Sequence, residues 1–79
     1  MFANNIVNDK MEILLDGKEI KFAVYDMTRN VVKSSEGRTW DLRNTAGRYV
    51  ANGTYLVIVE DKDKNGKVYR YSAKLGVKR

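Results

Sequence analysis

The side chains that could do chemistry are few, and the most suggestive run is Asp61-Lys62-Asp63-Lys64-Asn65-Gly66. Acidic and amide side chains that alternate before a glycine match the first half of a calcium-binding loop. The complete loop also needs a bidentate acid at its twelfth position, which is Ser72 here. Because strand-like sequences flank the run, we expect a solvated hairpin tip, with no metal and no cofactor.

The single tryptophan offers a second kind of chemistry, because Trp40 with Asp41 could form a ligand platform beside an acid. The alternative is a buried indole whose neighbouring carboxylate accepts N–H groups of the following loop. We expect the buried arrangement.

The tyrosines could include a row that stacks sugars or bases. Tyrosine is also a good strand residue, and a small core needs its aromatic side chains. We therefore expect Tyr55, Tyr69 and Tyr71 to pack inside, and Tyr25 and Tyr49 to be half exposed.

The composition of the 79 residues excludes several classes of site. The absence of Cys and His removes disulfides, thiol nucleophiles, histidine bases and the usual zinc ligands. Most acidic residues lie beside turns, so we expect no catalytic carboxylate pair and no enzyme. No stretch approaches the roughly 18 apolar residues of a membrane span, and residues 1–9 lack the features of a signal peptide. We expect a single domain over residues 1–79.

The net charge of +5 is concentrated at the end of the chain. Residues 1–60 carry eight Lys/Arg and eight Asp/Glu, whereas residues 61–79 carry seven basic residues against two acidic ones. A basic end on a neutral body indicates an address or a docking edge. Nucleic acid is the alternative partner, but the basic strand face has no interleaved aromatic residues, and no helix is predicted to enter a groove.

Turn signals divide the chain into short strands. Residues 2–8 could form an edge strand, and Asp16-Gly17 predicts a two-residue hairpin turn. Pairing Leu15 with Lys18 would set Ile13 opposite Ile20 and Met11 opposite Phe22, so that apolar residues share one face. The following segments are predicted to be a turn (27–30), a short strand (31–34), a polar loop (34–37) and the tryptophan strand (38–42).

Residues 54–61 are apolar on both faces, which is typical of a central strand covered on both sides. Residues 67–78 alternate cleanly and form the last strand. A two-residue turn at Asn65-Gly66 and a three-residue loop at 64–66 are both possible. We favour the three-residue loop, which places Gly66 in the left-handed region and pairs Val59 with Tyr71 and Val57 with Ala73.

The stretch from Trp40 to Val59 organises the chain, because turn formers at residues 44, 47 and 52–53 fold a loop back on the body, with Tyr49-Val50 as an apolar pin. About seven short strands with turn signals every 8–12 residues then predict an all-β fold. We expect an antiparallel β-sandwich that is Ig-like in general architecture.

These residues also resemble a known family, the type A C-terminal sorting domain of proteins exported by the bacterial type IX secretion system. The related Ig-like domain of the flagellar hook-capping protein is similar as well. The resemblance covers nearly all of the chain. It is carried by Tyr25 and Asp26, by a second motif of Trp40, Asp41, Asn44, Gly47, Val50, Gly53 and Tyr55, and by the closing Lys74, Leu75, Gly76, Val77, Lys78 and Arg79.

The chain departs from the family pattern at two glycines. The turn glycine of the first motif is replaced around Arg29-Asn30, where Asn30 can adopt a positive φ, and the glycine after Trp-Asp is Leu42. The Pro-Asn-Pro often found at the start of the family is present only as Ala3-Asn4-Asn5.

The resemblance implies a non-catalytic tag at the C-terminus of a larger exported protein, fused to an N-terminal cargo domain. Such a domain folds in the periplasm, is recognised by the outer-membrane secretion machinery and reaches the cell surface or the medium. Lys74 to Arg79 would be the recognised segment, docking by charge or by strand addition. A structural Ig-like module and a small carbohydrate-binding module that uses Tyr25, Tyr49 or Trp40 are the alternatives.

Overall fold

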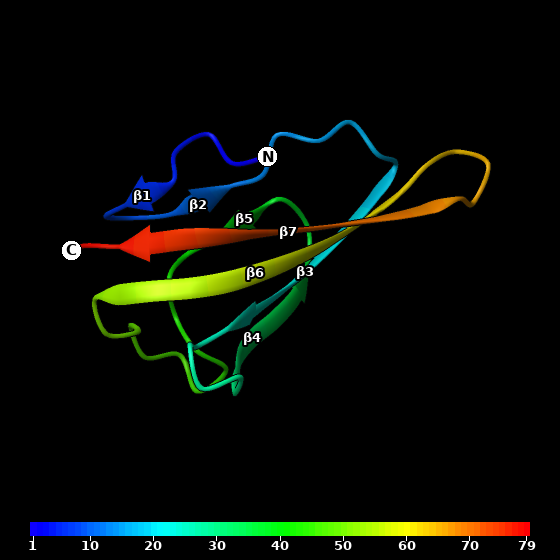
Figure 1. The fold of residues 1–79 in the computed structure, drawn as a ribbon. Coiled ribbons are helices and arrows are strands. Elements are labelled where there is room, and N and C mark those ends of the chain that lie inside the picture. The colour runs from blue at the N-terminus through cyan, green and yellow to red at the C-terminus, as the bar shows by residue number, and fades with distance from the viewer.

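The computed structural model describes all 79 residues, Met1–Arg79, and contains seven strands and no helix (Figure 1). It therefore has no helix of the length and apolar character that crossing a membrane requires. The predicted all-β sandwich is confirmed. The strands are β1 (Ile6–Val7), β2 (Met11–Glu12), β3 (Glu19–Tyr25), β4 (Val31–Glu36), β5 (Thr39–Trp40), β6 (Gly53–Lys62) and β7 (Val68–Val77).

The strands form two unequal layers. Five of them make one sheet in the order β1-β7-β6-β3-β4, and β2 pairs with β5 in a small second sheet. Every pairing is antiparallel except that of β1 with β7, which is parallel. The molecule measures 38 × 22 × 20 Å, and Figure 1 shows the β6–β7 hairpin forming one end of the long axis.

One cluster of apolar side chains fills the space between the layers. The large sheet contributes alternate residues of three strands, because successive side chains of a strand point to opposite faces. The small sheet and its loops supply the cover. The buried residues are Ile20, Phe22 and Val24 from β3, Tyr55, Val57 and Val59 from β6, Leu75 and Val77 from β7, and Phe2, Val7, Met11, Ile13, Trp40, Leu42 and Val50 from the rest of the chain.

The second face of the large sheet has no covering layer. Leu56 and Ile58 of β6 point to this face and are only partly buried. The prediction that this strand is covered on both sides is therefore wrong, although its central place in the sheet is confirmed.

The predicted hairpin at Asp16-Gly17 is wrong. Both edges of β3 are occupied, since Phe22 lies opposite Ser35 of β4 and Val59 of β6, and β2 pairs with β5 instead. Asp16-Gly17 carries the chain from one sheet to the other. A Cβ at Gly17 would come within 1.3 Å of the Asp61 Oδ1 atom, so the glycine allows this close crossing. The four apolar residues of the predicted pairs are nevertheless buried.

Two local predictions at the edges of the sheet have different outcomes. Residues 2–8 do contain an edge strand, β1. Ser34–Glu36, predicted as a loop, belong to β4 and pair with Lys21–Ala23 of β3. Pairing with a neighbouring strand overrides their polar character, because strand propensity depends on the surroundings.

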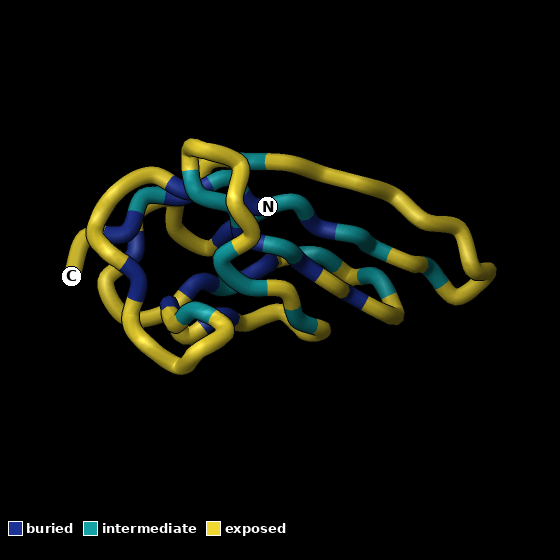
Figure 2. Tube along the Cα trace, turned by 90° about the horizontal axis from the view of Figure 1, so that it is seen from below, coloured by how far each residue is buried: buried dark blue, intermediate teal, exposed yellow.

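The register of the β6–β7 hairpin is as predicted. Val59 lies opposite Tyr71 and Val57 opposite Ala73, and Gly66 has a φ of 84°. However, Tyr69 and Tyr71 are exposed, so the prediction that they pack in the core is wrong. They point to the core-facing side of the sheet, but the second layer does not extend that far. Figure 2 shows the tip of this hairpin as exposed and the buried segments gathered toward the other end.

Candidate functional site

The closing segment Lys74–Arg79 alternates between the core and the solvent. Leu75 and Val77 are 0% and 2% exposed, whereas Lys74 and Lys78 are exposed. Gly76 packs against β1, where an added Cβ would lie 3.3 Å from Ile6 Cγ1. The segment therefore presents basic side chains on a strand that its own apolar residues anchor.

The last residue, Arg79, is held by the loop that follows β5. Asn52 Oδ1 accepts a hydrogen bond from the Arg79 backbone N–H at 3.0 Å, and Asn52 Nδ2 donates to the Arg79 carbonyl at 3.3 Å. The Arg79 guanidinium donates to the Val50 carbonyl at 3.0 Å and lies 4.4 Å from the centre of the Tyr49 ring. Nothing in the sequence pattern indicated that Asn52, assigned only to a turn, fixes the end of the chain.

The same loop is folded around its own polar groups. Arg43 donates to the Gly47 carbonyl and the Tyr49 hydroxyl, and its guanidinium lies 4.3 Å from the centre of the Tyr49 ring. Asn44 Oδ1 accepts the Arg48 N–H at 3.0 Å, which closes the predicted turn. Tyr49 is half exposed and Val50 is buried, as predicted.

Trp40 lies at the centre of the core and is not a ligand platform. It is 2% exposed, its ring meets Tyr55 edge to face at 6.2 Å, and its Nε1 donates to the Arg43 carbonyl at 2.8 Å. Asp41 Oδ1 accepts the Arg43 N–H at 3.1 Å. The predicted buried indole with an Asx-type turn is therefore confirmed.

Two residues without glycine's freedom have a positive φ, Arg29 at 72° and Leu42 at 66°. Side chains rarely adopt this region, so each position needs a local reason. Leu42 is fully buried, and packing of its side chain in the core offsets the strain. The expectation that Asn30 would take the positive φ is wrong, because Arg29 takes it.

The turn around Arg29 is organised by Asp26. Its Oδ1 accepts hydrogen bonds from the Thr28 hydroxyl at 2.7 Å, the Thr28 N–H at 2.9 Å and the Asn30 N–H at 3.0 Å. The bond from the Thr28 side chain, followed by that from the Asn30 backbone, holds the pKa of Asp26 below its usual value of 3.8.

Tyr55 ties β6 to the same region. Its hydroxyl donates to the Ala51 carbonyl at 2.6 Å, four residues upstream, as in the tyrosine corner of β-sandwiches. Burial raises the pKa of Tyr55 above 10.0, the Asp26 charge adds to the increase, and Arg79 opposes it.

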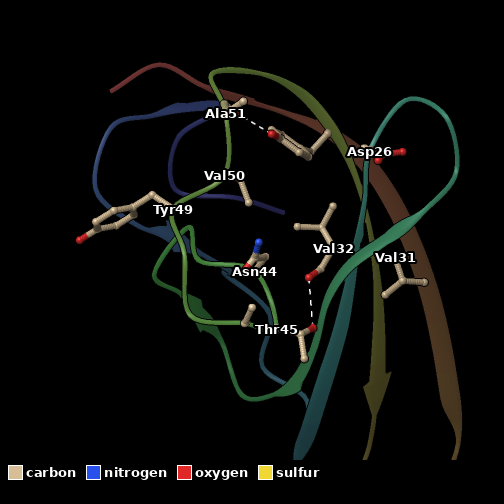
Figure 3. A pocket seen from close by; sticks show the side chains of 10 residues that line it. Asp26, Val31, Val32, Asn44, Thr45, Tyr49, Val50 and Ala51 are labelled. Atoms are coloured by element: carbon tan, nitrogen blue, oxygen red, sulfur yellow. Dashed lines mark hydrogen bonds between the residues drawn. The ribbon is translucent and has the colours of Figure 1, made fainter.

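A shallow hollow of about 510 Å³ lies between β4 and the loop that joins β5 to β6 (Figure 3). Two of its polar groups are bonded within the chain: Thr45 Oγ1 donates to the Val32 carbonyl at 3.3 Å, and the Tyr55 hydroxyl donates to the Ala51 carbonyl. Figure 3 shows the Tyr49 side chain pointing away from the hollow. Seven of the ten residues that line the hollow are hydrophobic, and no cluster of metal-binding side chains lies in it.

The two aspartates of the acidic run at the hairpin tip have different surroundings. Asp63 Oδ1 accepts the N–H groups of Asn65 and Lys67, both at 2.9 Å, and so caps the turn. Asp61 lies beside Gly17, and its buried Oδ1 has no hydrogen-bond partner. No three acidic, His or Cys side chains come together in the structure.

Comparison with protein-family models and with curated proteins finds no match. Among solved structures, the chain is similar to CopC from Methylosinus trichosporium OB3b, with a TM-score of 0.66. The alignment covers 95% of this chain and 83% of that one at 17% sequence identity. At this identity the likeness shows a shared β-sandwich fold and nothing about function.

Proposed function

We propose that this domain is a non-catalytic sorting domain, which directs a larger exported protein through the type IX secretion machinery to the cell surface or medium. Its partners would be an N-terminal cargo domain fused to it and the outer-membrane secretion machinery. The proposal rests on the sequence resemblance, and one observation in the structure supports that resemblance.

The supporting observation is the backbone at the two positions where the family pattern has glycine and this chain does not. In the family, glycine stands three residues after the Asp of the first motif and directly after Trp-Asp of the second. Here these positions are Arg29 and Leu42, the only two non-glycine residues with a positive φ. Glycine is favoured wherever the backbone needs a positive φ, so the backbone of this chain at the two positions is the one that the family's glycines would favour, which supports the resemblance.

The closing segment has the form that recognition of a folded tag requires. Lys74 and Lys78 are exposed on a strand, and Arg79 is held by Asn52. Because Arg79 is already held, it loses little conformational entropy when an acidic receptor binds, and the exposed charges of Lys74 and Lys78 speed the encounter.

Deleting residues 74–79 would be an ambiguous test, because it also removes buried Leu75 and Val77. The sharper test is the double substitution Lys74→Glu and Lys78→Glu in a reporter fusion, expressed in a host with this secretion route. We expect export to fall at least tenfold while the domain stays folded. Lys18→Glu with Lys64→Glu, an equal charge change at exposed residues outside the closing segment, is expected to leave export unchanged.

Normal export of the folded Lys74/Lys78 variant would favour the structural Ig-like module, in which the last strand is only scaffold. The carbohydrate-binding alternative loses its main support, because Trp40 is buried and the Tyr49 ring is covered by guanidinium groups of Arg43 and Arg79.

A further inference from the structure

The first half of β7 is an open sheet edge. β6 borders the strand along its whole length, but on the other side β1 pairs only with Gly76 and Val77. The Gly76 N–H donates to the Asn5 carbonyl at 2.8 Å, so even-numbered residues of β7 direct their backbone groups to this side. By the alternation of a strand, the N–H and C=O groups of Val68, Arg70, Ser72 and Lys74 point to the same side, where no backbone partner lies.

The fold itself keeps this edge open. If the chain before β1 continued along β7, residues 2–4 would pair with residues 72–74. Instead, Phe2 bridges Ile13 and the Ala3 N–H donates to the Glu12 carbonyl, so the N-terminal segment crosses to the second sheet. The stretch of β7 from Val68 to Lys74 is thus left available for strand pairing.

The side chains along this edge differ between the two faces of the sheet. Tyr69 and Tyr71 are 40% and 41% exposed on the core-facing side, beyond the point where the second layer ends. On the opposite face of the sheet, Arg70 and Lys74 are exposed, and Arg70 reaches Glu60 at 3.5 Å. An added strand would therefore meet apolar rings on one face and basic groups on the other.

The charges along β7 indicate whether the open edge would pair with a second copy of this chain or with a different protein. If two β7 edges paired antiparallel about Ser72, Arg70 of one copy would lie opposite Lys74 of the other. Like charges directly opposite each other destabilise a strand pair. A strand with acidic residues at these positions would be attracted instead.

We infer that the β7 edge from Val68 to Lys74 binds an extended acidic segment of another protein by strand addition. Alternate residues of that segment are acidic and lie beside Arg70 and Lys74, and the residues between them are apolar and pack on Tyr69 and Tyr71. This site overlaps the closing segment only at Lys74, and it does not depend on which secretion route the domain serves.

The test uses the full chain and a fluorescein-labelled seven-residue peptide of alternating Glu and Val, with binding followed by fluorescence anisotropy. Ser72→Pro removes one N–H group that points to the open edge and none that bonds β6, so the fold should be kept. We expect at least tenfold weaker binding to this variant and less than a twofold change for the matched Ser72→Ala.

Two further measurements keep the proposal testable if Ser72→Pro fails to fold. A peptide of the same sequence with N-methyl groups on alternate amides keeps its charge but cannot form the edge bonds, and we expect it to bind at least tenfold more weakly. Peptide binding is also expected to slow amide hydrogen exchange at Arg70, Ser72 and Lys74. Equal binding of the methylated peptide, protection elsewhere, or edge protection caused by dimers of the chain alone would overturn the inference.

Discussion

The two halves of β7 have the same alternating sequence and different surroundings. In the half toward the C-terminus, Leu75 and Val77 are enclosed by Trp40 and the rest of the second layer. In the half toward the hairpin tip, Tyr69 and Tyr71 occupy equivalent positions on the same face and are exposed. The difference lies in what covers the sheet: two short strands and one loop cover the first half, and nothing covers the second.

This comparison separates stability from recognition within one strand. Burial of apolar area stabilises the fold in the covered half, at about 25 cal/mol for each Å² removed from water. In the uncovered half, the same kinds of side chain remain available to a partner. Tyr69 and Tyr71 add little to the small core of this domain and are left for contacts with another molecule.

The largest expected effect tests the covered half. Trp40→Ala removes the largest fully buried side chain and its bond to the Arg43 carbonyl. We expect a loss of about 3–5 kcal/mol in the free energy of unfolding, a large fraction of the stability of a small domain. Tyr71→Ala is the matched change in the uncovered half and should cost below about 1 kcal/mol. Urea unfolding followed by circular dichroism measures both, and equal losses would break the comparison.

A smaller effect is expected where the chain crosses between the layers. Gly17→Ala would drive a methyl group into Asp61 Oδ1, and we expect a loss of about 1–3 kcal/mol. Asp61→Ala removes a buried oxygen without a partner, so alone it should be nearly neutral. The double variant is expected to recover most of the stability. If thermal unfolding shows no such recovery, the overlap with the Asp61 side chain is not the reason that residue 17 must be glycine.

The hydrogen bonds between Asn52 and Arg79, at the end of the covered half, should contribute less to the free energy of unfolding. Asn52→Ala removes both hydrogen bonds to the Arg79 backbone, which together stabilise this end by about 1 kcal/mol. We expect faster amide hydrogen exchange at Arg79 by NMR, with the β6–β7 hairpin unchanged. Asn65→Ala at the hairpin tip is the control and should leave Arg79 exchange as it is.

The smallest effect concerns the Asp26 turn at the border of the covered half. Because the folded-state pKa of Asp26 lies below 3.8, its ionised form stabilises the fold above pH 3.8. That contribution is lost as the pH falls from 3.8 through the lowered pKa. Thr28→Ala removes the main cause, so an NMR titration of the Asp26 carboxyl should show its pKa rising toward 3.8. The exposed Thr39→Ala is expected to have no such effect.

Local signals predicted the local structure well. Gly66 and the alternation in residues 67–78 were sufficient for the register of the last hairpin, because a turn of fixed length sets which residues face each other. Asp16-Gly17 was an equally strong turn signal and misled, because the partners of β3 come from residues 31–36 and 53–62. At the candidate site, the exposure of the closing strand's lysines could be predicted from the alternation of apolar and polar residues. The hydrogen bonds between Asn52 and Arg79 could not, because these residues are 27 apart in the sequence and no local pattern indicates that they meet.

The sequence alone determined the strand count, the turns at residues 27–30 and 64–66, the buried tryptophan and the cationic end, since these depend on residue type and short spacings. Only the tertiary structure decided how far the second layer reaches, and with it which tyrosines are exposed and which edge of β7 is open. The physical reason is that alternation assigns a side chain to a face of a sheet, while burial depends on what another part of the chain places over that face.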